Sequence, residues 1–355
     1  MAKLLMKGNE AIAEAAIRAG CRYFFGYPIT PQNQIPEYMS KRMPQVGGTF
    51  LQAESEVAAI NMVYGAAGAG ARVMTSSSGP GISLKQEGIT YIVGAELPCV
   101  IVNIMRGGPG LGSIQPSQSD YFQATRGGGH GDYNMPVLAP ASVAEAAELT
   151  AKAFDLADKY RTPVLVLGDG MIGQMMEPVD MPEAFPQTVP EKPWATVGWS
   201  DKSARPRAVV NSLYIDPKVL EQHNIRLQEK YVKIAAEQVQ VATELTDDAE
   251  IVLVAYGTMS RIARSAVRAA RAEGIKVGLI RPITLWPFPS DTIRQAAKTA
   301  ERFLVIEMSA GQMIEDVKLA LNGARPVGFY GRMGGMVPSV DEVLSEIRKT
   351  ARKGE

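Results

Sequence analysis

Cysteine and histidine are scarce in this chain of 355 residues, which contains two of each. Cys21 and Cys99 lie in or beside the apolar runs CRYFF and LPCVIVNI, a setting that predicts buried packing residues rather than a pair of ligands. An iron–sulfur cluster normally requires about four thiolates. The chain therefore cannot hold such a cluster by itself.

Net charge is also absent, because 37 lysines and arginines balance 37 aspartates and glutamates. This balance gives no sign of a field that would attract nucleic acid or an anionic membrane. No stretch has the roughly 20 uninterrupted apolar residues that span a membrane. The N-terminal pattern is that of an amphipathic helix and lacks the apolar core of a signal peptide. We expect a cytoplasmic protein that binds neither nucleic acid nor membrane.

From residue 9 onward, stretches with helical periodicity alternate with short apolar, β-branched runs such as RYFFGY, ARVMTSS and PCVIVNIM. This alternation predicts an α/β fold with a parallel sheet and helices on both faces. We expect a first domain over 1–180 and a connecting segment over 181–244 that is proline-rich and then helical from 217 to 240. A second α/β domain is expected over 245–355.

Polar side chains follow three of the predicted strands, at the sheet edge where ligands of open parallel sheets collect. Thr30 follows RYFFGY, Pro28 and Ile29, and is expected to cap a helix that begins at Pro31. Glu54 and Glu56 follow TFLQA at the start of a helix. Arg106 ends the run CVIVNIM and precedes GGPGLG.

Each of these residues also has an ordinary structural explanation. The threonine suits a helix cap, a first-turn glutamate suits the helix dipole, and the arginine suits a surface ion pair. Their shared position at one edge of the sheet favours a ligand site but does not identify a reaction.

The motifs themselves resemble a known family. GYPITP, AESEVAAINMVYGAAGAGA followed by TSSSGPG, and IMRGGPG are together similar to the α subunit of 2-oxoacid:ferredoxin oxidoreductases. VLVAYGTMSRIARSAV and GLIRPITLWPFP resemble the C-terminal domain of transketolase-type enzymes. The resemblance covers nearly the whole chain and implies a thiamine-diphosphate-binding fold, with a pyrimidine-type domain followed by a transketolase C-terminal-like domain. QAESEVAAINMVYG and GPGLGSIQPSQSDYFQATRGGGHGDY are most similar to the 2-oxoisovalerate type.

This resemblance implies roles for individual residues. Glu56, rather than Glu54, would hydrogen-bond N1′ of the aminopyrimidine and favour the tautomer that removes the thiazolium C2 proton. The backbone of Pro28 and Ile29 would lie against the pyrimidine. Thr30 would contact the substrate's carboxylate or keto oxygen.

Three further residues belong to the implied substrate site. Arg106 would bind the substrate carboxylate as a permanently charged, fork-shaped donor. Gln118 and Asp120 are candidates for polar contacts near the same mouth, although solvation of the loop explains them equally well.

One motif is misleading. Gly168, Asp169 and Gly170 match the GDG with which thiamine-diphosphate enzymes begin a magnesium site, but the next asparagine is the distant, single Asn211. We therefore interpret the GDG as a turn at a strand end and predict no metal site in this chain. The resemblance implies that a β subunit binds Mg²⁺ and the pyrophosphate half of a shared thiamine diphosphate. It also implies a γ subunit, a ferredoxin-like subunit with [4Fe–4S] clusters, external ferredoxin, and coenzyme A as co-substrate.

The implied reaction is the coenzyme A-dependent oxidative decarboxylation of a branched-chain 2-oxoacid to acyl-CoA and CO₂, with reduction of ferredoxin. Oxidation of 2-oxoglutarate or pyruvate is one alternative. For 2-oxoglutarate we expect a second cation, because a buried unpaired carboxylate is costly, and none follows Arg106 until Arg126. A non-catalytic assembly subunit is the other alternative, although it would be expected to have lost at least one of Thr30, Glu56 and Arg106.

Three other features leave two interpretations open. His130 lies in RGGGHGDY and suits either an acid–base role or a loop residue. His223 lies in the helical connecting segment, where a structural or solvent-facing role is expected. The turn from Gly257 to Ser260 suits an anion site at a helix N-terminus, but an ordinary capped turn is favoured.

Overall fold

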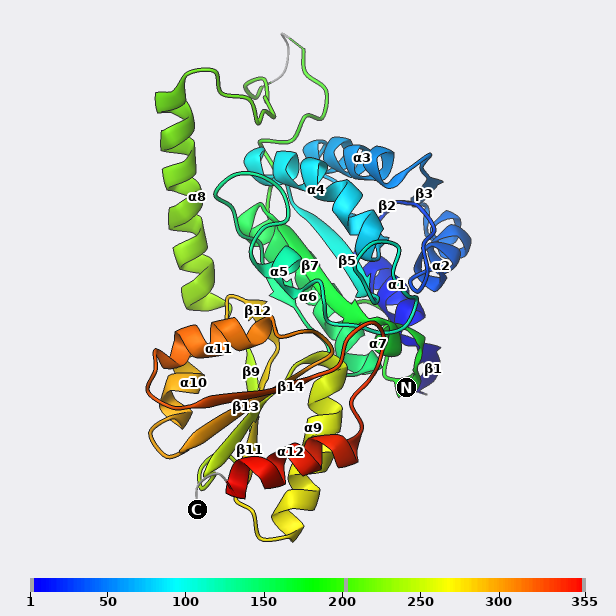
Figure 1. The fold of residues 1–355 in the computed structure, drawn as a ribbon. Helices are drawn as coiled ribbons and strands as arrows, with labels where there is room; N and C mark the ends of the chain where they lie inside the picture. The colour runs from blue at the N-terminus through cyan, green and yellow to red at the C-terminus, as the bar shows by residue number, and fades with distance from the viewer. Residues whose placement is uncertain (1–2, 201–203, 353–355) are drawn as a thin grey trace.

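A computed structural model describes residues 3–200 and 204–352, which form two α/β units joined side by side (Figure 1). The first unit contains a seven-stranded sheet in the order β12-β6-β7-β5-β4-β2-β3. Its strands are β2 (Tyr23–Gly26), β3 (Thr49–Gln52), β4 (Val73–Ser77), β5 (Cys99–Met105), β6 (Val137–Leu138), β7 (Pro163–Asp169) and β12 (Thr284–Trp286). All pairs are parallel except that of β12 with β6. The predicted α/β fold is confirmed.

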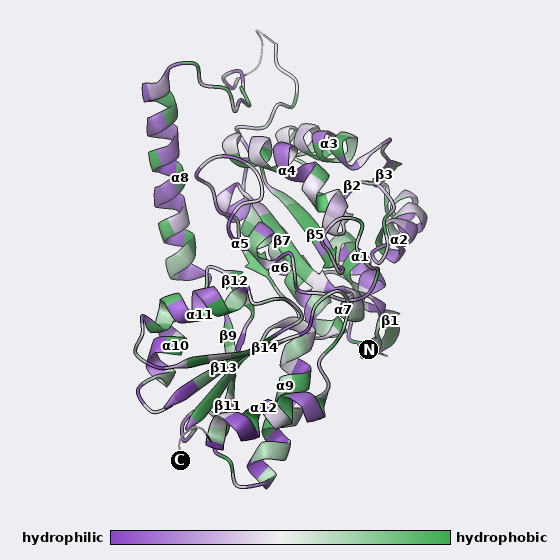
Figure 2. Ribbon diagram, viewed as in Figure 1, coloured by the Kyte–Doolittle hydropathy of each residue, from purple (hydrophilic) through white to green (hydrophobic). Residues whose placement is uncertain are grey.

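Two layers of helices cover this sheet. Helices α1 (Gly8–Arg18) and α6 (Val143–Tyr160) pack against each other, as do α3 (Glu56–Gly68) and α4 (Gly79–Gly94). Strand β5 lies between β4 and β7 and is buried at every position, which explains its continuous apolar sequence. Figure 2 shows hydrophobic residues along β5 and β7 beneath the helices. Cys21 and Cys99 are both buried and free, as predicted.

Shorter elements complete the first unit: α2 (Gln34–Arg42), the 3₁₀ turn Pro44–Val46, α5 (Tyr121–Thr125) and α7 (Gly170–Gln174). Strand β8 (Met176–Val179) returns to pair antiparallel with β1 (Leu4–Lys7). Helix α8 (Pro217–Glu237) follows the irregular connection and confirms the predicted helix there. Asp216 caps it by accepting a hydrogen bond from Lys218 N. Among the described residues, no helix is both long and apolar enough to cross a membrane.

The second unit is a five-stranded sheet in the order β14-β13-β10-β11-β9. Its strands are β9 (Val241–Glu244), β10 (Ile251–Val254), β11 (Val277–Pro282), β13 (Arg302–Glu307) and β14 (Val327–Gly331). Helix α9 (Gly257–Ala272) packs with α12 (Val340–Arg352), and α10 (Ser290–Ala296) packs with α11 (Met313–Leu321). Figure 1 shows this unit below the first, with the connection between β14 and α12 lying against the first unit.

Polar contacts join the two units. The Gln118 side chain donates to Tyr256 O at 2.9 Å and accepts from Met308 N at 3.0 Å. Arg281 forms a two-pronged ion pair with Glu145, at 2.7 and 2.9 Å. Strand β12 crosses from the second half of the chain into the first sheet. The loop that follows β5 is therefore held by both units.

Candidate active site

The loop after β2 presents Thr30 at the carboxyl edge of the first sheet. Helix α2 begins at Gln34, so the prediction that Thr30 caps a helix beginning at Pro31 was wrong. The reason is that the Pro31 carbonyl is used by side chains from elsewhere: the Asn9 and Gln174 amides donate to it, each at 2.8 Å. A turn therefore separates Thr30 from the helix. Thr30 Oγ1 accepts a long hydrogen bond of 3.3 Å from Asn33 Nδ2.

Pro28 and Ile29 lie in the same loop, with Pro28 exposed and Ile29 half-buried. The buried Gln32 side chain ties this loop to β4, because it donates to Tyr27 O and accepts from Ser76 Oγ. The backbone of Pro28 and Ile29 is thus held over the ends of β2 and β4. Their contact with a cofactor stays a prediction.

Arg106 connects the β2 loop to the glycine-rich loop after β5. Its Nη1 donates to Thr30 O and its Nη2 to Leu111 O, both at 2.9 Å. Nε is buried and has no hydrogen-bond partner among the described residues. A guanidinium carries five N–H donors, so three remain available to an anion.

Glu56 is the first residue of α3 and is only 7% exposed, whereas Glu54 is exposed. The cap of α3 is Ser55, whose side chain accepts from Ala58 N. The Glu56 carboxylate faces the first turn of α4: a Cβ placed on Gly81 would lie 2.6 Å from Glu56 Oε1 and 2.1 Å from Ser77 Oγ. Only glycine leaves room here.

The same turn also contacts Arg106. A Cβ on Gly79, whose φ is +38°, would lie 3.6 Å from Arg106 Cγ. Glu56 and Arg106 therefore approach two glycines of the first turn of α4. Arg106 also donates a hydrogen bond to the Thr30 carbonyl. The structure thus brings together the three residues predicted as catalytic, although they lie in separate parts of the chain.

Buried polar atoms without partners gather around this edge of the sheet. Within the described residues, they are Asn33 Oδ1, Ser77 Oγ, Ser78 Oγ, Asn103 Oδ1 and Arg106 Nε. Buried polar atoms normally find hydrogen bonds, so such a concentration fits a site for a polar ligand. Only Arg106 was predicted from the sequence. The run of hydroxyl residues in TSSSGPG, directly after a strand, was the signal that could have indicated the serines.

Asp120 and Gln118 differ in their surroundings. Asp120 Oδ2 accepts a hydrogen bond of 3.0 Å from Asn103 at the site. Burial raises the pKa of Asp120, and the Asn103 hydrogen bond and the Arg106 charge oppose that rise. Gln118 is fully buried, and its amide is engaged by the backbone of the second unit.

Asp169 of the GDG lies in a turn at the end of β7, as predicted. Its carboxylate caps α7 by accepting from Met171 N and Ile172 N at 2.9 and 3.1 Å. It also accepts from Thr258 Oγ1 at 2.8 Å, so the anion at the start of α9 is this carboxylate. Burial raises the pKa of Asp169, and these donors lower it. The residues that the structure describes contain no group of three or more histidine, cysteine or acidic side chains suited to a metal ion.

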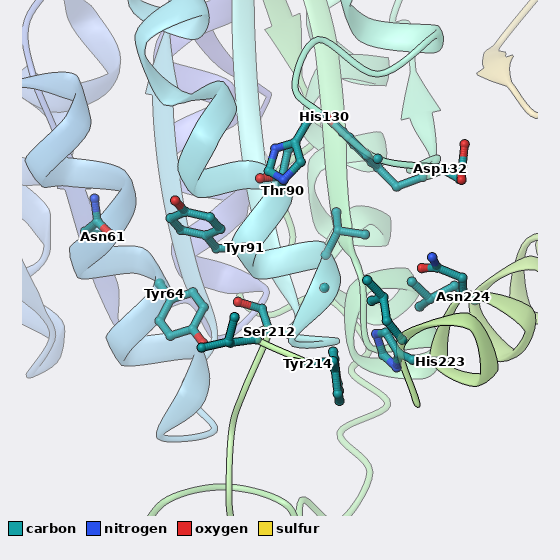
Figure 3. A pocket seen from close by; sticks show the side chains of 17 residues that line it. Asn61, Tyr64, Thr90, Tyr91, His130, Asp132, Ser212, Tyr214, His223 and Asn224 are labelled. Atoms are coloured by element: carbon teal, nitrogen blue, oxygen red, sulfur yellow. The ribbon is translucent and has the colours of Figure 1, made fainter. Parts of the chain in front are cut away.

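Both histidines line a separate cavity of about 570 Å³ between α3, α4, α8 and the loop at 130–133 (Figure 3). Thr30, Glu56 and Arg106 are not part of its wall. His223 is buried against Tyr214, with 4.9 Å between ring centroids, and burial lowers its pKa. Its burial fits the expected structural role rather than a solvent-facing one. His130 is exposed in its loop.

Comparison with known proteins identifies the family. Residues 14–243 match the thiamine-diphosphate-binding family of pyruvate flavodoxin/ferredoxin oxidoreductases, and residues 249–343 match core domain II of pyruvate:ferredoxin oxidoreductase. The chain belongs to the 2-oxoacid:ferredoxin oxidoreductases, as an α subunit. The two matched ranges correspond to the first unit with its connection and to the second unit.

Individual relatives are similar over their whole length. The chain is 55% identical over 351 residues to ketoisovalerate oxidoreductase subunit VorB of Methanothermobacter thermautotrophicus, covering 99% of both chains. It is 38% identical to the 2-oxoglutarate synthase subunit KorA of the same organism, covering 98% of both.

Two solved structures share the architecture. A 2-oxoglutarate:ferredoxin oxidoreductase from Magnetococcus marinus, with 2-oxoglutarate, coenzyme A and succinyl-CoA bound, matches with a TM-score of 0.87 at 26% identity. That match covers 98% of this chain and 65% of the other. A split-gene transketolase, an inactive β4 tetramer, matches with a TM-score of 0.62 at 16% identity and shares the fold alone. The predicted transketolase-like architecture is confirmed.

Proposed function

We propose that this chain carries the pyrimidine half of the active site in an oxidoreductase that decarboxylates branched-chain 2-oxoacids. Coenzyme A would accept the acyl group, and ferredoxin would accept the electrons. The observation that carries the proposal is the convergence of Glu56 and Arg106 on the first turn of α4, with Arg106 also bonded to Thr30 O. A subunit with a purely structural function would have no need of this arrangement.

The site has the features that thiamine diphosphate requires of its pyrimidine side. Gly81 lets Glu56 Oε1 and Ser77 Oγ approach the first turn of α4, and the hydroxyls of Ser77 and Ser78, which have no partner among the described residues, offer hydrogen bonds. When bound, the cofactor supplies the nucleophilic carbon that adds to the keto group and stabilises the charge left by CO₂. Glu56 would hold a proton at the ring nitrogen N1′, in a setting with little water. Pro28 and Ile29 would support the ring through their backbone.

Arg106 and Thr30 would orient the 2-oxoacid. Arg106 has three free N–H donors beside the loop after β2, which suits a carboxylate better than a neutral group. The Thr30 hydroxyl is engaged by one long hydrogen bond and can turn toward the substrate's carboxylate or keto oxygen. Asp120, which lies nearby, is a candidate for a further polar contact. Gln118 would support the loop from the joint between the units.

The segments 107–115 and 333–336 form an apolar rim near Arg106, which favours a substrate with a branched aliphatic side chain. The loop at 107–115 abuts the segment at 333–336, where a Cβ on Gly335 would lie 2.4 Å from Gln115 Cβ. The two segments expose hydrophobic side chains: Leu111, Ile114, Met333 and Met336, which are 82, 57, 62 and 52% exposed. Contact between these exposed apolar side chains and an aliphatic group of the substrate would remove both from water, which lowers the free energy of the complex.

Two arginines near this rim in sequence, Arg126 and Arg332, are already paired with carboxylates. Arg126 contacts Asp316 at 3.1 Å, and Arg332 contacts Glu342 at 3.0 Å. Neither offers an unpaired charge for the distal carboxylate of 2-oxoglutarate. This pairing, together with the relatedness to a ketoisovalerate oxidoreductase subunit, favours branched-chain acids over 2-oxoglutarate.

Catalysis would require partner subunits. The exposed side of α3 and α4 carries Val57, Leu84 and Tyr91, an apolar surface suited to a second chain. A β subunit there would bind Mg²⁺ and the pyrophosphate half of the cofactor. A γ subunit and a ferredoxin-like subunit with [4Fe–4S] clusters would pass electrons to external ferredoxin.

The test is anaerobic purification of the tagged chain from its native host, followed by dye reduction assays. The complex should reduce a viologen with coenzyme A and 2-oxoisovalerate faster than with 2-oxoglutarate or pyruvate, and should contain cluster-bearing subunits. Faster turnover of one of the other acids would overturn the substrate assignment. A chain that purifies alone and supports no reduction would instead fit the assembly subunit.

A further inference from the structure

Lys85 is a fully buried lysine in the middle of α4, next to the candidate active site. Its side chain has 0% exposure, and its Nζ donates one hydrogen bond, to Thr75 Oγ1 of β4 at 2.8 Å. An ammonium group has three N–H donors and is costly to bury, so lysines are rarely enclosed without a paired charge. A negative charge near Lys85 would offset this cost while the amine is protonated.

The geometry of α4 and β4 directs Lys85 toward Glu56. Lys85 lies four residues after Gly81, on the same face of α4, and Thr75 lies two residues before Ser77, on the same face of β4. The Lys85–Thr75 hydrogen bond is thus one helical turn from the contact of Glu56 with Gly81 and Ser77. Glu56, Ser77, Thr75 and Lys85 are all buried, and we call these four residues of α3, β4 and α4 the buried polar strip.

Charges along this strip are few. Burial lowers the pKa of Lys85 to about 7, and the charges of Glu56 and Cys99 raise it in opposition. Burial also raises the pKa of the Cys99 thiol to about 12, so that thiol is neutral near pH 7. Among the described residues, this leaves Glu56 as the negative charge that Lys85 faces. Thr75 supplies only a dipole.

We propose that Lys85 is a positioning residue whose positive charge stabilises the ionised carboxylate of Glu56. The proton that Glu56 shares with the cofactor's ring nitrogen would then reside on the nitrogen, which is the state that the C2 chemistry requires. Lys85 itself touches neither cofactor nor substrate. This inference rests on the proposed function of Glu56.

Replacement of Lys85 by methionine tests the charge, because methionine keeps the length and volume of the stem. In the purified complex, we expect thiamine diphosphate to bind stoichiometrically while hydrogen–deuterium exchange at C2 slows about tenfold at pH 6. The slowing should be largest where Lys85 of the wild type is charged and should shrink as the pH rises through the Lys85 pKa of about 7. The difference should vanish above about pH 8, where Lys85 of the wild type is itself neutral.

A second variant covers the case in which Lys85→Met fails to assemble. Thr75→Val keeps the lysine but removes its hydrogen-bond partner, so the ammonium should lose its proton at lower pH. Exchange should then follow the wild type at pH 5 and fall toward the Lys85→Met rate nearer pH 6. A Thr75→Val profile identical to that of the wild type would count against the proposal.

The thermal unfolding of the complex gives a readout independent of turnover. If Lys85 and Glu56 balance each other, Lys85→Met should lower Tm in the wild type but restore part of the Tm lost in Glu56→Gln. Strictly additive changes in Tm, with a slowing that is the same at every pH, would overturn the role of Lys85 while leaving the proposed function intact. Absence of C2 exchange in the wild-type complex would overturn the proposed function itself.

Discussion

Glu54 and Glu56 are two residues apart, yet only Glu56 is buried and faces the first turn of α4. Glu56→Gln should reduce C2 exchange by at least about 100-fold in the assembled complex, because an amide cannot take the proton that the carboxylate shares. Glu54→Gln is the matched control and should change the rate less than about threefold. Exchange at the wild-type rate in Glu56→Gln would eliminate the proposed role, and an equal loss in both variants would show that neither glutamate is specific.

Arg106 joins two loops and keeps three donors free. Arg106→Lys should raise the KM for the 2-oxoacid about tenfold or more, since an ammonium lacks the planar fork that binds a carboxylate through two parallel hydrogen bonds while the two carbonyls are also held. The concentration of thiamine diphosphate for half-maximal activity should change much less. Titration of each ligand in turn separates these effects, and equal changes in the two would argue against a carboxylate-binding role.

At the scale of elements, the first turn of α4 is the place that both Glu56 and Arg106 approach. Gly81→Ala should weaken cofactor binding and C2 exchange, because its Cβ would displace Ser77 Oγ or Glu56 Oε1. Equilibrium dialysis of thiamine diphosphate with the assembled complex measures the first effect. Unchanged binding and exchange would mean that the two oxygens move aside without consequence.

The loop at 107–115 and the segment at 333–336 form the apolar rim at the site entrance. Leu111→Arg should raise kcat/KM for 2-oxoglutarate relative to 2-oxoisovalerate about tenfold, because the new cation can pair with the distal carboxylate. Leu319→Arg on α11 is the control, since Leu319 is 74% exposed and belongs to neither segment. A similar change of preference in the control would point to net charge rather than to the rim.

At the scale of the whole molecule, the described residues include the proposed pyrimidine site, and they contain no group of three or more histidine, cysteine or acidic side chains suited to a metal ion. The isolated chain should therefore bind thiamine diphosphate at least about 100-fold more weakly than the complex, because its pyrophosphate half would have no magnesium site. Isothermal titration with and without Mg²⁺ measures this. Tight binding in a one-to-one ratio by the chain alone would contradict a cofactor shared between subunits.

Much of the fold could be predicted from the sequence because periodicity is a local property. The runs CVIVNIM and TPVLVLGDG became the central strands β5 and β7, and the helix expected from 217 became α8. Thr30, Glu56 and Arg106 could be predicted as neighbours because side chains directly after parallel strands share one edge of the sheet. That rule needs no knowledge of which strands are neighbours.

Only the tertiary structure decided features that depend on residues distant in the chain. Helix α2 begins at Gln34 because Asn9 and Gln174 occupy the Pro31 carbonyl, and no pattern near residue 31 indicates this. Likewise, β12 extends the first sheet although most of its neighbours in sequence build the second. The sequence by itself determined the elements, the family and the polar residues at the strand ends. Packing determined that Arg106 holds Thr30 and that Lys85 lies buried one turn beyond Glu56, because both depend on contacts that form only in the folded chain.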